Sequence, residues 1–433
     1  MKKFTFKKLV FGFSTIAMSL LFFQCSKNNT TTITIPTLTT MAITPSSTSQ
    51  FVATSGGNIS SAGNGTITAY GICYSSTNQN PDLTCEYTND GQGAATNYTS
   101  YITDFSPNTT YYIRAYATNS AGTGYGNLIQ YTTGTANWAS VYFISNLKAL
   151  SGISFSDDNH GWAYGINTNN QVVLITSVDG GTTWTTSTNP VNTNTISLSL
   201  TYNGAYLPTK NKSICFTNLG DGWIVYGGDS VLTTQNGGVT WSLVPYTTSA
   251  PVPGQGLNSL SFYNSLTGVV SGLGLYKTVG GTSWTNQANA ATYFNSVYFT
   301  SQNIGFAGTN TGIYKSIDGG NTWTAIANTT SPIYGFYFAN GVLYAAGSQS
   351  LLISTDQGVT WTNKQAPNNG GSTLYNVCFI NQNFGVAATQ TGLYQTYDGG
   401  NTWAIINTSG AFNDVCRTSN HVFAISGTSI LKM

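Results

Sequence analysis

Ser316-Ile317-Asp318-Gly319-Gly320-Asn321-Thr322-Trp323 is one of six copies of an octapeptide that recurs between Ser177 and Trp403. The other copies end at Trp184, Trp241, Trp284, Trp361 and Trp403. An Asp-Gly or Asn-Gly pair accepts the positive φ of a tight hairpin, and its side-chain oxygen can accept hydrogen bonds from nearby backbone N–H groups. The tryptophan begins the next strand, where its burial stabilises the fold by a few kcal/mol, at roughly 25 cal/mol per Å². The octapeptide therefore predicts a repeated structural turn.

The octapeptide matches the BNR or Asp-box signature S-x-D-x-G-x-T-W, and this resemblance implies a β-propeller. The third copy, Thr278-Val279-Gly280-Gly281-Thr282-Ser283-Trp284, lacks the acidic position. The residues expected to hold the turns together are Ser177, Asp179, Gly181, Trp184, Asn236, Trp241, Trp284, Ser316, Asp318, Trp323, Ser354, Asp356, Trp361, Asp398 and Trp403.

A Gly-aromatic phrase such as Gly161-Trp162 precedes each octapeptide, and an inner strand such as 296–299 precedes that phrase. Each unit thus contains four strands over roughly 40 residues, which is typical of a propeller blade. The residues after Trp403 offer only three strands for a seventh blade. The segment 137–142 resembles an outer strand and can supply the fourth, which removes two exposed sheet edges. We expect an all-β fold whose residues 136–433 form a seven-bladed β-propeller closed by the 137–142 strand.

Short alternating runs separated by Gly, Asn and Ser clusters occupy residues 37–134 and predict a β-sandwich. Tyr111 fits a tyrosine corner, in which the hydroxyl bonds back to upstream backbone. The run 113–119, followed by three alternating glycines, resembles fibronectin type III domains of bacterial surface proteins, although the early core tryptophan of that family is missing. Cys73 and Cys85 fall on neighbouring predicted strands, and the sequence leaves open whether they form a disulfide or stay reduced.

The N-terminus has the layout of a secretory signal peptide. Four lysines precede an apolar run from Leu9 to Phe23, which is short for a membrane span. The run ends at Gln24-Cys25 and resembles a bacterial lipobox, although Gln24 departs from the usual small residue. We expect residues 1–24 to be removed, Cys25 to be lipidated and residues 25–36 to form a tether. Plain secretion is the alternative to an anchor in the cell envelope, at the outer membrane or cell surface.

The chain carries only 14 basic and 13 acidic residues among 433, with one glutamate, two histidines and two arginines. Electrostatic binding of nucleic acid is therefore excluded. Sialidases carry Asp-boxes, but their family needs three arginines and a glutamate, whereas this propeller has only Arg417 and no glutamate. A glycosidase with two aspartates stays open, and the acids outside the octapeptides are Asp157, Asp158, Asp221, Asp229 and Asp414.

No spacing typical of a metal site or a catalytic triad is present, so we expect neither a metal nor a cofactor. Cys215, Cys378 and Cys416 share one inner-strand register, which favours thiols packed in the core. His160 stands where other repeats carry Asp221 or Asn303, which favours a turn residue over a general base.

The Gly-aromatic phrase followed by the Asp-box, across residues 138–433, resembles the propellers of photosystem II stability and assembly factors, which hold partner proteins. The resemblance implies a propeller fold and a role in holding partner proteins. The arginine-rich face of that family is absent from this sequence. We therefore expect a surface-anchored, non-catalytic, monomeric lipoprotein that binds a protein or a glycan, with an exported glycan-degrading hydrolase as the alternative. The longest interval between repeats places a candidate ligand loop at 185–212, or a tolerated insertion, and its candidate binding residues are Tyr202, Tyr206, Lys210 and Lys212.

Overall fold

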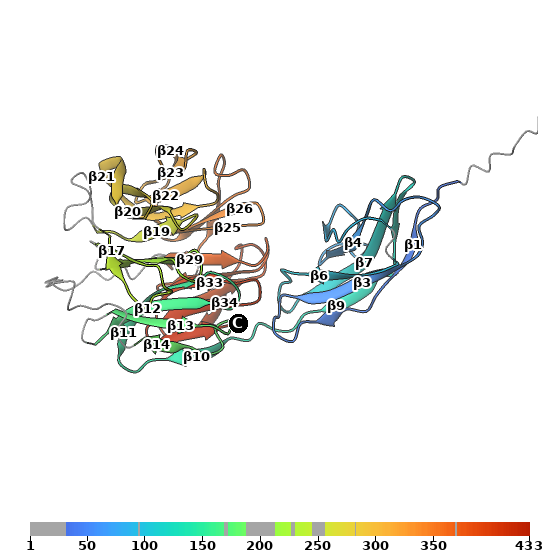
Figure 1. Ribbon diagram of the computed structural model, residues 1–433, viewed down its shortest axis with the longest axis horizontal. Helices are drawn as coiled ribbons and strands as arrows, with labels where there is room; N and C mark the ends of the chain where they lie inside the picture. The colour runs from blue at the N-terminus through green and yellow to red at the C-terminus, as the bar shows by residue number, and fades with distance from the viewer. Residues whose placement is uncertain are drawn as a thin grey trace, which may run out of the picture.

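The computed structural model describes residues 32–93, 96–168, 172–187, 213–226, 230–244, 256–281, 283–368 and 370–433. Within these ranges the chain forms β-strands and no helix, so no described segment could cross a membrane as a helix. The strands make two bodies, a small sandwich and a larger ring (Figure 1). The predicted signal peptide, Cys25 and the four candidate residues of the 185–212 loop lie outside the described residues.

The sandwich consists of two antiparallel sheets. The first sheet contains β1 (Thr37–Thr40), β2 (Thr44–Pro45), β3 (Ala53–Ser61) and β6 (Asn97–Ile102). The second contains β4 (Ala69–Ser75), β5 (Glu86–Tyr87), β7 (Thr110–Asn119), β8 (Gly122–Tyr125) and β9 (Ile129–Thr132). Residues of the neighbouring strands β4 and β7, such as Ile72, Ile113 and Ala115, are fully buried between the sheets. This is the two-layer core that alternating hydrophobic residues produce.

The Tyr111 hydroxyl accepts a hydrogen bond from the Ser106 backbone N–H at 2.9 Å, so the tyrosine corner predicted from the sequence is confirmed. The fold begins slightly before the predicted boundary, since the Thr34 N–H donates to the Gly63 carbonyl at 2.8 Å and Asn119 donates to the Thr34 carbonyl at 2.6 Å. The end of the expected tether is therefore part of the sandwich. The resemblance to fibronectin type III domains stays a prediction from sequence.

The ring consists of antiparallel sheets, each of which runs from an inner strand outward. The first two blades contain β11 (Leu147–Phe155), β12 (Gly161–Asn167), β13 (Val172–Ser177) and β14 (Thr185–Ser187), then β15 (Ile214–Phe216), β16 (Gly222–Tyr226), β17 (Ser230–Thr234) and β18 (Ser242–Leu243). The fifth and sixth contain β25 (Ile333–Ala339), β26 (Val342–Gly347), β27 (Ser350–Ser354) and β28 (Thr362–Gln365), then β29 (Leu374–Phe379), β30 (Gly385–Thr389), β31 (Gly392–Thr396) and β32 (Ala404–Asn407).

The third and fourth blades share one six-stranded sheet because two long strands link them. The strands are β19 (Ser259–Phe262), β20 (Thr267–Val279), β21 (Trp284–Phe299), β22 (Gly305–Thr309), β23 (Gly312–Ser316) and β24 (Thr324–Asn328). The first part of β21 pairs with β20, and its last part pairs with β22 as the inner strand of the fourth blade. The sheet therefore counts as two blades.

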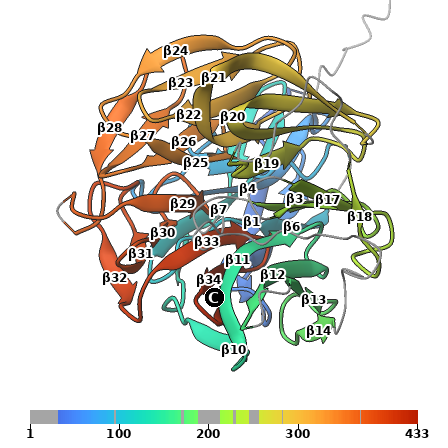
Figure 2. The same cartoon turned by 90° about the vertical axis from the view of Figure 1, so that its left-hand side faces the viewer.

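The seventh blade takes strands from both ends of the ring. It contains β33 (Phe412–Arg417), β34 (Val422–Ser426) and β35 (Ser429–Lys432), with β10 (Ala139–Phe143) on the outside. β10 pairs with β35 in antiparallel fashion, with Ala139 opposite Lys432. This pairing closes the ring with a seventh blade. Figure 2 shows the ring from its face with the sandwich behind it.

Stacked aromatic side chains join neighbouring blades. Trp162 stacks on Phe216 with ring centroids 3.9 Å apart, and Tyr344 stacks on Phe379 at the same separation. Polar contacts repeat as well, since the Phe216 N–H donates to Ser154 Oγ at 3.1 Å. Each blade thus buries one face of its neighbour, which explains why the repeat needs a complete ring.

Candidate functional site at the junction of the two domains

The acidic octapeptide residues act inside their own turns. Asp179 accepts hydrogen bonds from Ser177 Oγ at 2.9 Å, from the Thr183 N–H at 2.8 Å and from Thr183 Oγ1 at 2.6 Å. These bonds, led by that from the Thr183 hydroxyl, lower the pKa of Asp179 to about 2. The carboxylate is therefore an ionised acceptor that holds the hairpin, a role that leaves no proton for acid catalysis at neutral pH.

The other acidic copies repeat this geometry. Hydrogen bonds led by that from the Thr360 hydroxyl lower the pKa of Asp356 to about 2. Burial would raise the pKa of Asp318, but hydrogen bonds from Thr322 and Ser316 outweigh it and lower that pKa to about 2. At Asp398 burial is likewise outweighed by hydrogen bonds, and the pKa is lowered. Asn236 takes the acidic position in the second copy and accepts from the Thr240 N–H at 2.9 Å.

In three of the copies the final tryptophan also bonds within the turn, as Trp184 Nε1 donates to the Gly181 carbonyl at 3.1 Å. Trp241 and Trp323 make the same bond. Gly181 itself has a φ of 71°, a conformation that favours glycine. In these copies the contacts fix the spacing between the glycine and the tryptophan.

The aspartates outside the octapeptides support neighbouring backbone. Asp157 accepts from His160 Nδ1 at 2.9 Å, which ties His160 to its own turn. Asp158 accepts from the Ser419 N–H at 2.7 Å, and buried Asp414 accepts from the Ile153 N–H at 3.2 Å. Asp221 accepts from Asn218 at 2.8 Å, and Asp229 lies outside the described residues. In the described part of the chain no group of three or more His, Cys, Asp or Glu side chains could hold a metal ion.

The structure gives the positions of the cysteines that were singled out from the sequence. Cys73 and Cys85 are free thiols in the structure rather than a disulfide. Cys73 is buried on β4, where its thiol lies 3.3 Å from the Pro81 carbonyl oxygen, and burial raises its pKa to about 12. Cys378 is a fully buried free thiol, and Cys215 packs beside the core cluster that contains Trp223.

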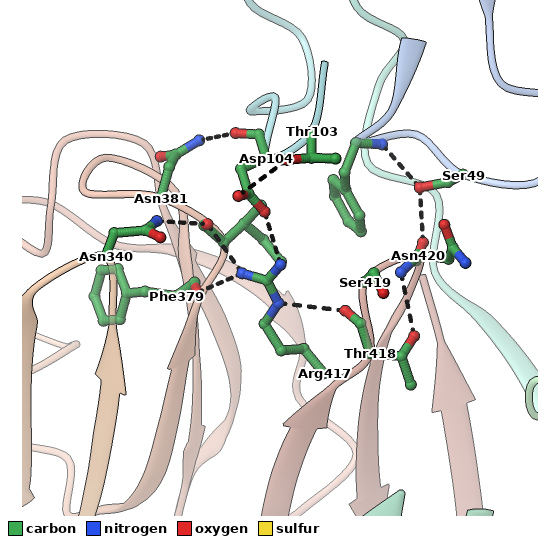
Figure 3. Close-up of polar contacts among 12 residues, drawn as sticks. Ser49, Thr103, Asp104, Asn340, Phe379, Asn381, Arg417, Thr418, Ser419 and Asn420 are labelled. Atoms are coloured by element: carbon green, nitrogen blue, oxygen red, sulfur yellow. Dashed lines mark hydrogen bonds and ion pairs between the residues drawn. The ribbon is translucent and has the colours of Figure 1, made fainter. Parts of the chain in front are cut away.

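An ion pair joins the sandwich to the propeller (Figure 3). Arg417, at the end of β33, lies 2.7 Å from a carboxylate oxygen of Asp104 in the sandwich. The same guanidinium donates to the Phe379 carbonyl at 3.1 Å and to the Ile380 carbonyl at 3.0 Å. Because these bonds share one planar group, they fix the orientation of the Arg417 guanidinium toward the sandwich. The single arginine of the propeller therefore serves the contact between domains.

Further polar and apolar contacts surround this ion pair. Asn381 Nδ2 donates to the Asp104 carbonyl at 2.6 Å (Figure 3). The same nitrogen lies 2.9 Å from Ser106 Oγ. Ser49 Oγ donates to the Asn420 carbonyl at 2.9 Å. Phe51 of the sandwich is 1% exposed and belongs to the same buried cluster as Phe384 of the propeller. A buried aromatic side chain with polar contacts around it makes the junction a defined interface.

A groove of about 600 Å³ lies beside this junction. The sandwich lines it with Tyr74, Ser75, Ser76, Thr77, Asn78, Thr84, Cys85, Glu86, Tyr87, Asp104 and Tyr111, and the propeller with Asn340, Asn381, Gln382 and Asn383. The groove therefore offers hydroxyls, amides and two carboxylates, and no lysine or arginine lines it among the described residues. Such a lining suits a neutral or basic ligand.

Strand β5 gives the groove a second property. It is the end strand of the sheet order β5-β4-β7-β8, and both of its residues line the groove. An end strand has backbone N–H and C=O groups that no further strand of its sheet occupies. A peptide can pair with such an edge, while side chains in the groove read its sequence.

Sequence reasoning missed this junction. Asp104 and Arg417 are 313 positions apart in the chain, and neither belongs to a motif. The one available signal was that the propeller contains a single arginine. Of the sequence-predicted site residues, only Cys85 lines the groove.

The comparisons with known proteins concern the propeller. Residues 131–292 match the family model of the photosynthesis system II assembly factor YCF48, over less than half of the chain. A solved structure of YCF48 bound to D1 peptide is 18% identical and covers 69% of this chain and 96% of its own, with a TM-score of 0.53. The propeller is YCF48-like.

A second solved structure, YCF48 from Cyanidioschyzon merolae, is 17% identical and covers 69% of this chain and 98% of its own, with a TM-score of 0.51. At this identity the likeness of the two YCF48 structures establishes the shared propeller fold. No curated protein matches the sequence. The YCF48-like resemblance predicted from the Gly-aromatic phrase and the Asp-box is thus confirmed for the propeller.

Proposed function

We propose that this chain is a non-catalytic binding protein of the bacterial cell envelope that holds a partner protein through the junction groove. The groove carries the proposal, because it combines a sheet edge at β5 with a lining in which none of the described residues is cationic. The YCF48 structure with a bound D1 peptide gives a precedent for peptide binding by a propeller protein of this type. We favour a neutral or basic segment of the partner.

Catalysis is the weaker alternative. A glycoside hydrolase that uses propeller aspartates needs two carboxylates facing one sugar. The described octapeptide aspartates accept hydrogen bonds from their own turns, and Asp157 and Asp158 are engaged in the same way with His160 and Ser419. Groups held in this way are poor candidates for proton transfer.

Anchoring through Cys25 is the second part of the proposal. A lipid on Cys25 would place the sandwich next to the envelope and present the propeller beyond it. Labelling of cells with an alkyne-bearing fatty acid is expected to mark the wild-type chain and not the Cys25→Ser variant. Equal labelling of both chains, or none in either, would remove the anchor and leave plain secretion as the alternative.

Binding through the groove is tested with purified residues 26–433. Proteins crosslinked to this chain in envelope membranes are identified, and affinity is then measured for synthetic peptides that tile the partner found. We expect Tyr87→Ala, at the groove, to weaken the best peptide at least tenfold. Tyr101→Ala is the matched control, because Tyr101 is 71% exposed on the other sheet of the sandwich, whereas Tyr87 is 53% exposed in the groove.

Two results would contradict the proposal. Equal affinity of the wild type and Tyr87→Ala would show that the partner binds elsewhere. A glycan array followed by a product-release assay covers the alternatives, because turnover of a bound glycan would establish the hydrolase.

A further inference from the structure

The octapeptide turns carry apolar side chains that the turns themselves do not need. Each of the six copies has one exposed large apolar residue, at its second or its sixth position. These residues are Val178, Val239, Val279, Ile317 and Val359, which are 70% to 75% exposed, and Tyr397, which is 38% exposed. Polar residues occupy the same positions in other copies, such as Thr355 at the second and Asn321 at the sixth. The geometry of the hairpin therefore does not require these apolar residues.

Two of the blades add a second apolar residue in the loop that adjoins the turn. In five blades the first glycine of the turn donates its N–H to a carbonyl in the loop between the first and second strands, and the acceptors are Asn159, Gly220, Leu266, Asn303 and Asn383. The second and third blades place Leu219 and Leu266 in this loop, and these side chains are 53% and 58% exposed. At the matching positions the first, fourth and sixth blades have only polar residues, namely Asp158, Asn159, Gln302, Asn303, Gln382 and Asn383.

The second and third blades thus bring four exposed apolar side chains to two neighbouring turns. We call this set the apolar patch, and it consists of Leu219, Val239, Leu266 and Val279. Leu266 lies against the third turn, because its carbonyl accepts from the Gly280 N–H at 2.7 Å. A cavity of about 640 Å³ lies between the two turns, lined by Leu266 and Gly280 of the third blade and by residues of the second blade that include Thr240.

The shortened third octapeptide explains the cavity. This copy lacks its acid and is one residue shorter than the others. In the second turn a Cβ on Gly238 would lie 2.4 Å from Leu174 of the first blade, so that turn packs closely on the blade before it. At Gly281, the matching glycine of the third turn, a Cβ would meet nothing within 4 Å. The cavity therefore has room for a side chain from another molecule, and Leu243, which is 39% exposed, adds to its apolar lining.

The apolar patch lies on the face of the ring to which the sandwich is attached. Asn381 follows β29 and Arg417 ends β33, so both contact the sandwich from the same kind of loop that carries Leu219 and Leu266. The sandwich projects from this face of the ring (Figure 1). It contacts loops of the sixth and seventh blades, whereas no described residue of the sandwich lines the cavity between the second and third turns.

The covered part of this face shows which kind of group such loops receive. Phe51 of the sandwich is 1% exposed and packs near Phe384, the last residue of the loop in the sixth blade, with ring centroids 6.4 Å apart. Asn381 of the same loop adds a hydrogen bond to the Asp104 carbonyl beside it. The loops thus bind a second domain through a buried apolar side chain with polar contacts around it.

We propose that the apolar patch docks a partner protein, which inserts an apolar side chain beside Leu266 as the sandwich inserts Phe51 beside Phe384. A cluster of exposed apolar side chains on one face of a protein typically marks an interaction surface. Asp221 is the one ionisable residue among those that line the cavity, and it already accepts a hydrogen bond from Asn218 at 2.8 Å. The recognition is therefore mainly apolar.

A lipid surface is the other apolar occupant that a cell envelope offers. Because the sandwich projects from the same face, a flat bilayer would meet the sandwich before it reached Leu266 or Val279 (Figure 1). A protein can fit beside the sandwich, so the geometry favours a protein. The apolar patch shares no residue with the junction groove, and this inference therefore goes beyond the binding proposed there.

Site-specific photocrosslinking of the full chain in the cells that produce it tests the docking. The photoreactive residue p-benzoylphenylalanine takes the place of Leu266, and light attaches it to whatever covers the apolar patch. We expect an adduct with one partner protein, attached at an apolar residue of that partner. The matched control carries the same residue in place of Asn159, which is exposed at the same loop position of the first blade, and it should give at least tenfold less adduct.

The affinity of the purified partner then tests the patch residues themselves. Val239→Ser combined with Val279→Ser should weaken binding at least tenfold, because two apolar contacts are lost. Val359→Ser combined with Val178→Ser is the matched control, since it makes the same two changes at the same octapeptide positions outside the patch, and it should bind like the wild type. All four valines are exposed, so equal melting temperatures should show that both double variants are folded.

Four results would overturn the proposal. Adducts of equal yield at the two labelled positions, or none at either, would mean that nothing docks specifically on the patch. An adduct between two copies of this chain would make the patch a self-association surface, and an adduct with lipid alone would replace the protein by a membrane. Equal affinity of the two double variants would place the partner elsewhere. Tyr87→Ala tests the junction groove separately, because it changes no residue of the patch.

Discussion

Trp162 stacks on Phe216 of the second blade, and Trp223 stacks on Phe262 of the third. Only the second blade also returns a turn carbonyl, that of Gly237, to the indole, and Trp223 Nε1 has no partner among the described residues. The two octapeptides share their glycine pair and their tryptophan, and they differ at the acidic position, which is Asn236 in one and missing in the other. The comparison indicates that the acid or its amide substitute does more than tighten a hairpin. It also holds the turn against the neighbouring blade.

Low pH should have the largest effect of the changes considered. It acts on the complete turns, which are those that keep their aspartate. The pKa values of Asp179, Asp318, Asp356 and Asp398 lie below the ordinary value of 3.8, so these turns contribute stability that is fully present above about pH 4. That stability is lost as the pH falls through the folded-state pKa values, which are about 2 for Asp179, Asp318 and Asp356. Thermal melting followed between pH 5 and pH 2 is expected to show a steep decrease in Tm.

A variant with asparagine at all four positions is the control, because Asn236 shows that an amide can hold the turn. It should fold at neutral pH and lose less stability between pH 4 and pH 2. An equally steep decrease in this variant would assign the acid sensitivity to other groups.

Loss of one acid from a complete turn should destabilise the protein by about 2 kcal/mol, since hydrogen bonds to a charged group contribute on the order of 1.5 to 3 kcal/mol. We expect this effect for Asp318→Ala in urea unfolding monitored by tryptophan fluorescence. The matched change in the incomplete turn is Val279→Ala, which should stay within about 0.5 kcal/mol of the wild type because Val279 is exposed. Equal losses in the two variants would mean that the acid has no special role.

Restoration of the acid in the incomplete turn should have a smaller effect of opposite sign. Insertion of an aspartate between Val279 and Gly280 gives Thr278 Oγ1 an acceptor and brings a carbonyl to Trp223 Nε1, a gain of about 1 kcal/mol per satisfied group. The same unfolding measurement checks it. A loss of stability on insertion would show that the third turn is adapted to its shorter length.

The smallest effect separates the two stacked tryptophans. Trp162→Phe removes a bonded donor and leaves the Gly237 carbonyl unsatisfied, which should cost about 1 kcal/mol. Trp223→Phe removes a donor that has no described partner, and its cost should be less than that of Trp162→Phe. Calorimetric melting of the two variants side by side measures the difference, and a larger loss for Trp223→Phe would reveal an internal partner for its indole.

Local patterns predicted the repeated part of the fold well. The octapeptide predicted the hairpins because its residues bond to one another over a span of five positions, as Ser177 and Gly181 do. The tyrosine corner was predictable for the same reason, since Tyr111 contacts backbone only five residues away. The segment around Trp138 resembles an outer strand, and β10 indeed pairs with β35.

Contacts between distant segments were not predictable from such patterns. Nothing near Asp104 in the sequence indicates that its partner is Arg417, and Phe51 reads as an ordinary strand residue although it packs into the propeller core. The sequence also showed that the third octapeptide lacks its acid, but a deletion by itself predicts neither a cavity nor an unsatisfied indole in another blade.

The amino-acid sequence alone determined the turns, the strands and the number of repeats, because those follow from hydrogen bonds and hydrophobic periodicity within a few residues of each other. Only the folded ring decided which side chains meet across blades and across the domain junction. Burial there removes water from groups such as Arg417, so that each must find a partner in the protein, as Arg417 does in Asp104.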